Sequence, residues 1–172
     1  HTGKLFAYEH YGITPDILSS AKALGGGFPI GAILTTDKIA PTFGPGTHGS
    51  TFGGNPMACA VGSRAFDIIN APETLAHVEK QGQKFQTTLR ELCEKTGVFK
   101  EVRGMGLLIG CVLADKYQDR ASEITAAALK HGLMVLVAGS DVVRFAPSLL
   151  LNDEDMAEGL KRLEAALTEW IA

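Results

Sequence analysis

The sequence of 172 residues is short of basic charge and of long apolar runs. Its 16 lysines and arginines are outnumbered by 19 aspartates and glutamates, so the formal net charge is −3 and there is no broad basic surface for nucleic acid. No apolar run approaches the roughly 20 residues that a membrane-spanning helix needs. We therefore expect neither nucleic acid nor a membrane as a partner.

Cysteine is also scarce. The three cysteines, Cys59, Cys93 and Cys111, are far apart in the sequence and odd in number. This spacing predicts reduced thiols instead of a disulfide framework or a zinc site, and reduced thiols are typical of cytoplasmic proteins. No group of histidine, cysteine and acidic residues has ligand spacing, so we expect no metal site. We interpret His48 as a hydrogen-bonding residue of a loop.

Glycine, in contrast, is abundant, and three of the 20 glycines directly follow a lysine among small residues. Lys22 precedes Gly25, Gly26 and Gly27, and glycine lets another group approach the main chain closely. A lysine amine that is shielded from water can form a Schiff base with a carbonyl group. Taken alone, these residues are more typical of a solvated lysine at a glycine-capped helix end.

Residues 41–56 form a second segment rich in glycine and proline. Their composition predicts a long ordered loop, and such loops in compact domains are often functional. Ser50 and Thr51 lie within it, and hydroxyl groups beside free backbone N–H groups suit phosphate oxygens. The alternative is an ordinary turn that these hydroxyls close on their own backbone.

The first 70 residues are otherwise predicted to hold one short buried strand, within 28–36, and one helix that begins at Pro56. The helix should place Val61, Ala65 and Ile68 on its apolar face. A longer helix is predicted from Pro72 to Gly97, with an apolar stripe. The stripe consists of Leu75, Val78, Phe85, Leu89 and Leu92.

The remaining residues predict a small α+β domain. Strands are expected at 98–102, 107–113, 134–137 and 142–146, the last two as a hairpin, with helices over 119–131 and from Asn152 onward. Gly104-x-Gly106 is followed by a strand, whereas a dinucleotide-binding fingerprint requires a helix there. We interpret Arg103 and these glycines as a structural turn, and a nucleotide-binding domain remains a remote alternative.

Two segments, residues 4–32 around Lys22 and residues 46–56 around Thr51, resemble the lysine segment and the phosphate-contact loop of class III, ornithine-type aminotransferases. The sequence is most similar to acetylornithine and succinylornithine aminotransferases, and this resemblance extends over essentially the whole chain. The resemblance implies an α/β fold, the C-terminal part of a fold type I pyridoxal-phosphate-dependent transferase. Residues 1–70 would end its large cofactor-binding domain, and 71–172 would form a linking helix and a small C-terminal α+β domain.

The same resemblance assigns roles to four residues. Lys22 would be the catalytic lysine that holds pyridoxal 5'-phosphate covalently, and Thr51 would contact the cofactor's phosphate across a dimer interface. Ser50 would lie near the substrate. Arg144 is the one charge in an apolar strand, and the family uses it to bind a substrate carboxylate; its alternative is a structural salt bridge.

The implied protein is a cytoplasmic homodimer with a shared active site. It would transfer an amino group from N-acetylornithine to 2-oxoglutarate in arginine biosynthesis, giving N-acetylglutamate 5-semialdehyde and glutamate. Alternatives are succinylornithine as the donor, in arginine breakdown, or ornithine or 4-aminobutyrate. The family's cofactor-binding aspartate, ring-stacking aromatic and first phosphate loop precede this segment, and it opens abruptly with His1-Thr2-Gly3. We therefore also expect that these residues alone are a non-catalytic fragment.

Overall fold

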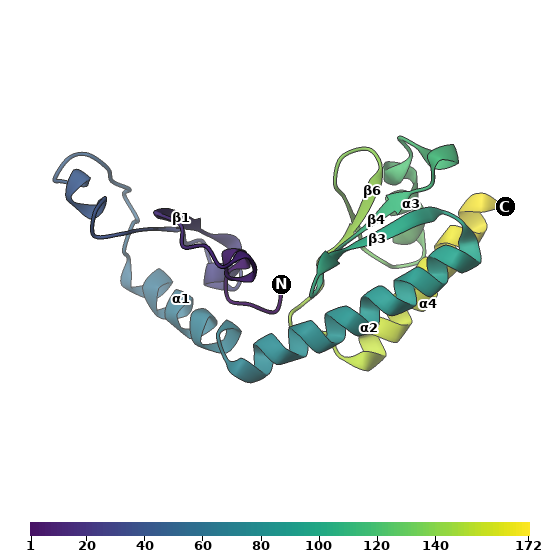
Figure 1. Cartoon of the computed structure of the whole chain (residues 1–172), viewed down its shortest axis with the longest axis horizontal. Helices are drawn as coiled ribbons and strands as arrows, with labels where there is room; N and C mark the ends of the chain where they lie inside the picture. The colour runs from purple at the N-terminus through teal and green to yellow at the C-terminus, as the bar shows by residue number, and fades with distance from the viewer. The chain divides into compact units, whose positions relative to one another are not determined.

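The computed structural model describes residues 1–172, which divide into two compact units (Figure 1). Residues 4–72 form one unit, and residues 1–3 together with 73–172 form the other. His1 joins the second unit through its carbonyl oxygen, which accepts a hydrogen bond of 2.8 Å from the backbone N–H of Leu107. Residues 1–3 thus contact the unit that contains residues 73–172.

In residues 4–72, strand β1 (Ile17–Ser20) pairs in antiparallel fashion with β2 (Ala32–Thr35). A 3₁₀ turn, Lys22–Gly25, lies between them, and two more occur at Ala7–Tyr11 and Ala40–Thr42. Helix α1 (Pro56–Ile69) begins at proline as predicted. Its N-terminus is capped by Asn55, whose side-chain oxygen accepts a hydrogen bond of 2.9 Å from the backbone N–H of Ala58.

The prediction of a buried strand within 28–36 was only partly correct. Strand β2 is shorter, and its side chains are exposed, with 65% of Ile33 and 50% of Leu34 accessible. A sheet buries its apolar side chains only against a second layer, and no other part of this chain covers these two. In α1 the buried positions are Ala58 and Gly62, and Ile68 is exposed instead of belonging to the buried face.

The other unit contains an antiparallel sheet in the order β3-β4-β6-β5, together with three helices (Figure 1). This arrangement confirms the predicted α+β domain. The elements are α2 (Pro72–Thr96), β3 (Phe99–Met105), β4 (Leu108–Leu113), a 3₁₀ turn (Asp115–Tyr117), α3 (Ala121–Lys130), β5 (Leu136–Val137), β6 (Val142–Phe145) and α4 (Asp153–Ile171).

The core of this unit lies between one face of the sheet and the helices. Four of the five predicted stripe residues of α2 are buried, and Leu75 is half-buried; the Phe85 ring packs edge-on against Phe145 with ring centroids 5.5 Å apart. Strand β4 is present as predicted, but its side chains alternate between buried and more exposed positions. Ile109 and Cys111 are buried, whereas Leu108 is 43% exposed, because the helices cover only one face of this antiparallel sheet.

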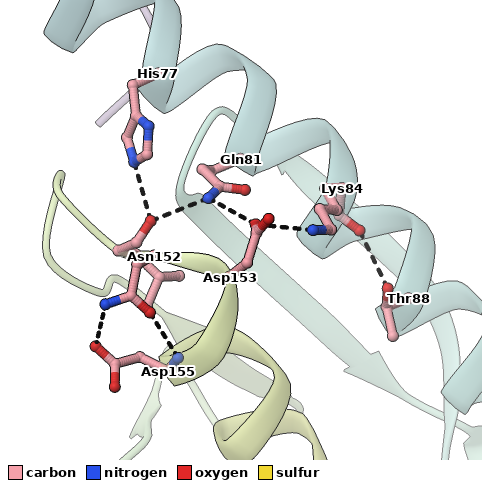
Figure 2. A network of polar contacts seen from close by, with 8 residues as sticks. His77, Gln81, Lys84, Thr88, Asn152, Asp153 and Asp155 are labelled. Carbon is pink, nitrogen blue, oxygen red and sulfur yellow. Dashed lines mark hydrogen bonds and ion pairs between the residues drawn. The ribbon is translucent and has the colours of Figure 1, made fainter.

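A polar network joins α2 to the start of α4 (Figure 2). His77 and Gln81 lie 2.9 and 3.2 Å from the carbonyl oxygen of Leu151, and both donate to it. Gln81 and Lys84 also donate to one carboxylate oxygen of Asp153, over 3.0 and 2.8 Å. The network therefore fixes the first turn of α4 to α2. Asn152 caps α4 as predicted, accepting a hydrogen bond of 2.7 Å from the N–H of Asp155.

Candidate functional site

Lys22 has an unusual backbone conformation. It directly follows Ala21 at the end of β1 and has a φ of +53°, a left-handed value shared by only one other non-glycine residue, Asp119. For an L-residue this conformation costs roughly 1–2 kcal/mol, and such strain clusters at functional sites. The Lys22 side chain is exposed, and its amine forms no ion pair. The structure thus presents a free amine on a strained turn.

The glycines after Lys22 allow its turn to pack closely. Gly25 is buried, and a Cβ atom at this position would lie 2.7 Å from Cγ2 of Ile30. Gly26 closes the turn in the left-handed conformation, donating a backbone hydrogen bond of 3.0 Å to Ala23. Gly62 of α1 would bring a Cβ atom within 3.2 Å of the same Ile30 side chain. Helix α1 therefore supports the turn that carries Lys22.

The loop before α1 is held by its own polar contacts. The Thr47 hydroxyl donates to the carbonyl of Gly44 over 2.7 Å and accepts from the Gly44 N–H over 3.1 Å. His48 places Nδ1 3.2 Å from the Thr47 hydroxyl and packs edge-on against Phe43. His48 is thus a hydrogen-bonding residue of the loop, as interpreted from the sequence.

Ser50 and Thr51 follow in the same loop, and both are exposed. The backbone carbonyl of Ser50 accepts a hydrogen bond of 3.2 Å from the N–H of Gly53. The turn is therefore closed by backbone groups, and the two hydroxyls remain free. Ser50 lines a hollow of about 720 Å³ that also involves Ile33 and Thr35 of β2. Free hydroxyls of this kind are suited to binding phosphate oxygens.

Arg144 lies on β6, between the buried side chains of Val143 and Phe145, and its own side chain is exposed on the opposite face of the sheet. It pairs in register with Gly110 of β4 and Leu136 of β5. No ion pair involves Arg144, so the alternative of a structural salt bridge is not formed within this chain. The guanidinium is available to an external carboxylate.

The four predicted site residues fall in both units. Lys22, Ser50 and Thr51 belong to residues 4–72, and Arg144 belongs to the unit of residues 1–3 and 73–172. Sequence reasoning interpreted Arg103 as structural, but it is exposed on the same face of the sheet as Arg144. No sequence signal related these two residues, because the pairing of their strands with the strand between them was not predicted.

The cysteines are free thiols, and two of them are neighbours in the fold. A thiol hydrogen bond with Cys93, together with burial, raises the pKa of Cys111 far above its ordinary value. Cys111 is therefore an inert, protonated core residue. No group of three or more histidine, cysteine or acidic side chains is placed to hold a metal ion. None of the helices combines the length and apolar character that crossing a membrane requires.

The chain is similar to known proteins that all belong to one enzyme family. The family model for class-III aminotransferases matches residues 1–167. The acetylornithine aminotransferase of Neisseria meningitidis serogroup B is 80% identical over 172 residues, which are all of this chain and 43% of that protein. A succinylornithine transaminase/acetylornithine aminotransferase of Pseudomonas aeruginosa is 53% identical over 98% of this chain and 42% of its own length.

The crystal structure of N-acetylornithine aminotransferase from Stenotrophomonas maltophilia superposes with a TM-score of 0.91 at 44% identity. It covers 99% of this chain, which corresponds to 44% of that structure. The predicted fold class and the resemblance noted from the sequence are therefore confirmed. The chain spans less than half the length of the relatives it matches, which agrees with the expectation of a C-terminal portion.

Proposed function

We propose, because the chain belongs to the class-III aminotransferase family, that it is the C-terminal portion of a pyridoxal-phosphate-dependent aminotransferase. The complete enzyme transfers the ω-amino group of N-acetylornithine to 2-oxoglutarate, giving N-acetylglutamate 5-semialdehyde and glutamate. The 80% identical acetylornithine aminotransferase of N. meningitidis supports this donor. The enzyme acts in arginine biosynthesis in the cytoplasm.

Lys22 carries the proposal. Its left-handed backbone and unpaired amine are the features that support a covalent role. Bound pyridoxal phosphate supplies an electron sink that stabilises negative charge on the substrate carbon beside the amino group. Lys22 would hold the cofactor, and its amine would move a proton to and from that carbon when the amino substrate is bound.

Thr51 and Ser50 have separate tasks in the proposal. The Thr51 hydroxyl donates to a phosphate oxygen of the cofactor in a partner subunit, so the enzyme is a homodimer with a shared active site. The Ser50 hydroxyl lies near the substrate. Both roles are supported by hydroxyls that take no part in closing their own turn.

Arg144 binds a substrate carboxylate through two parallel N–H···O bonds, the geometry for which a guanidinium is suited. Its lack of an ion pair within the chain supports this role, because an arginine already paired with an acid would have to exchange one carboxylate for another.

Succinylornithine is a second candidate donor, supported by the 53% identical P. aeruginosa protein whose name includes both activities. It differs from acetylornithine only in its longer, charged acyl group. The two candidates predict different ratios of kcat/KM for N-succinylornithine and N-acetylornithine in the full-length enzyme. Turnover of ornithine or 4-aminobutyrate would show that the enzyme accepts a broader range of amino donors.

The cofactor role of Lys22 is tested by borohydride reduction of the full-length protein, followed by peptide mass mapping. We expect one pyridoxyl phosphate group on the peptide that contains Lys22. Lys22→Ala should lose this group and all measurable turnover. Lys38→Ala, which removes another exposed lysine of residues 4–72, should retain both. A modified residue other than Lys22, or a Lys22→Ala protein with near-normal activity, would contradict the proposal.

A further inference from the structure

We propose that Arg103 is a second carboxylate-binding residue, which acts together with Arg144 on the same substrate carboxylate. The inference rests on the proposed function, because the role of Arg144 is taken from it. It adds a specificity-determining residue, located on a different strand from Arg144.

The strand register places the two arginines in one row across the sheet. Arg103 of β3 is paired with Gly110 of β4, and Gly110 is paired on its other side with Arg144 of β6. Residues directly opposite one another in antiparallel strands have their side chains on the same face. Both arginines therefore extend from the face of the sheet that the helices of this unit leave uncovered. Their Cα atoms are about 10 Å apart, the sum of two antiparallel pair distances.

Gly110 leaves space between them. A Cβ atom built at this position would lie 4.0 Å from Cγ of Arg103, so the stem of Arg103 already leans toward the glycine. It would also lie 3.0 Å from Cγ1 of Val142, and any longer side chain would occupy the space between the two arginines. The glycine therefore gives both guanidinium groups room to converge above the sheet.

Neither arginine has a counter-ion within this chain. Both are exposed, and none of the ion pairs in the structure involves either of them. The acid on this face that is closest along the chain, Glu101 on β3, forms no ion pair with Arg103. Two guanidinium groups brought together above Gly110 would repel each other, and an anion held between them would convert this repulsion into attraction.

A carboxylate can accept enough hydrogen bonds to bind both arginines. Its two oxygens provide about four lone-pair sites, enough to accept hydrogen bonds from two guanidinium groups at once. The substrates of the proposed reaction all carry a carboxylate. Arg103 therefore donates hydrogen bonds to the carboxylate lone pairs that Arg144 leaves free.

The test uses the full-length enzyme with its cofactor, and glutarate as an unreactive carboxylate probe. Arg103→Gln, Arg103→Lys, Arg144→Gln and the Arg103→Gln/Arg144→Gln double variant are compared with wild type. Calorimetry gives the dissociation constant of glutarate, and steady-state kinetics give KM and kcat for 2-oxoglutarate. Arg90→Gln is the matched control, because it removes an exposed arginine of α2 whose recorded partner is the neutral side chain of Gln86.

We expect Arg103→Gln to weaken glutarate binding and raise KM for 2-oxoglutarate by about tenfold or more, the usual loss for a charge-assisted hydrogen bond. Arg103→Lys should recover part of this loss, and kcat should change less than KM. The double variant should lose less than the product of the two single losses, because both arginines hold one carboxylate. Arg90→Gln should behave as wild type.

The outcomes separate this inference from the proposed function. If Arg144→Gln weakens glutarate binding and Arg103→Gln does not, the inference about Arg103 is wrong and the proposed function stands. If the double variant loses glutarate affinity by the product of the two single losses, the arginines do not share a carboxylate and the inference is wrong. If the wild-type enzyme neither retains pyridoxal phosphate nor transfers amino groups, the proposed function itself is wrong.

Discussion

Gly82 of α2 lies directly against Gly106, in the turn that joins β3 to β4. A Cβ atom on Gly82 would lie 2.3 Å from the carbonyl carbon and oxygen of Gly106. Gly106 is itself left-handed, with a φ of +53°, and a Cβ atom there would lie 2.2 Å from the carbonyl oxygen of His1. Three backbone segments thus meet where side chains are excluded. The gap that Gly82 makes in the apolar stripe of α2 is explained by this contact.

Gly82→Ala should therefore destabilise the full-length protein. The new methyl group meets backbone atoms that cannot move independently, and overpacking of this kind costs typically 1–3 kcal/mol, more than the roughly 1 kcal/mol that alanine gains over glycine within a helix. Gly159→Ala in α4 is the matched control, because its Cβ atom would be in ordinary contact, 3.7 Å from Leu133. Urea unfolding followed by circular dichroism should show a lower midpoint for the first variant and an equal or higher one for the second.

The backbone strain at Lys22 predicts an inverted preference between alanine and glycine. Lys22→Gly should be more stable than Lys22→Ala by about 0.5–1 kcal/mol, because glycine adopts a φ of +53° without the penalty that an L-residue has. At Ala23, where φ is not positive, replacement by glycine should lower stability instead. Both comparisons are made by urea unfolding of the full-length protein without cofactor. Equal stability of the two Lys22 variants would show that the turn relaxes.

Thr51→Val should weaken retention of pyridoxal phosphate. Loss of one hydroxyl donor to a charged phosphate oxygen corresponds to a rise of about tenfold or more in the dissociation constant. The constant is obtained by titrating the apoenzyme with cofactor and following its absorbance. Thr42→Val is the control, because the Thr42 hydroxyl is already bonded to the carbonyl of Ile39 over 2.7 Å. Unchanged affinity in Thr51→Val would exclude the hydroxyl as a phosphate donor.

Asp153 should contribute a pH-dependent part of the stability. The Lys84 ammonium, and then the Gln81 amide, donate to this carboxylate and hold its pKa below the ordinary value. A lowered pKa in the folded state means that the contribution is present above the unfolded-state pKa and is lost as the pH falls through the folded-state pKa. The stability difference between wild type and Asp153→Asn should therefore shrink as the pH is lowered below roughly 4.

Unfolding midpoints at several pH values between 6 and 3 measure this difference. Lys84→Met should reproduce the altered pH dependence, because it removes the main donor to Asp153. Lys161→Met, which removes an exposed lysine of α4 that forms no ion pair, should not. If Asp153→Asn and wild type differ by a constant amount at all pH values, the carboxylate is not stabilised by these donors.

The parts of the fold that sequence predicted well depend on local signals. Proline at the start of α2, Gly97 after its end and the Asn152 cap of α4 act through neighbouring backbone groups, so their effect is visible in the sequence. Burial of Ile33 could not be judged this way, because it depends on which other layer covers the strand. Likewise, the two serines of β1 give no alternating pattern, and this strand was not predicted.

In the candidate site, too, local sequence signals predict some features and the tertiary arrangement decides others. Lys22 and Thr51 were predicted because each lies in a distinctive continuous segment, whereas the strain at Lys22 becomes evident only from its backbone angles. The relation between Arg103 and Arg144 depends on strand order and register, which bring together residues from separate parts of the chain. Sequence motifs therefore predict single candidate residues, whereas the proposed pair requires the strand register.

The contact of residues 1–3 with the turn around Leu107 also constrains the order of events during synthesis. The hydrogen bond between His1 and Leu107 joins residues more than a hundred positions apart, and closing so long a loop is entropically costly. Residues 4–72 emerge from the ribosome as one continuous stretch, and their contacts can form while the partners of His1 are still untranslated. Docking of the segment before Lys4 is therefore expected to be a late step in folding.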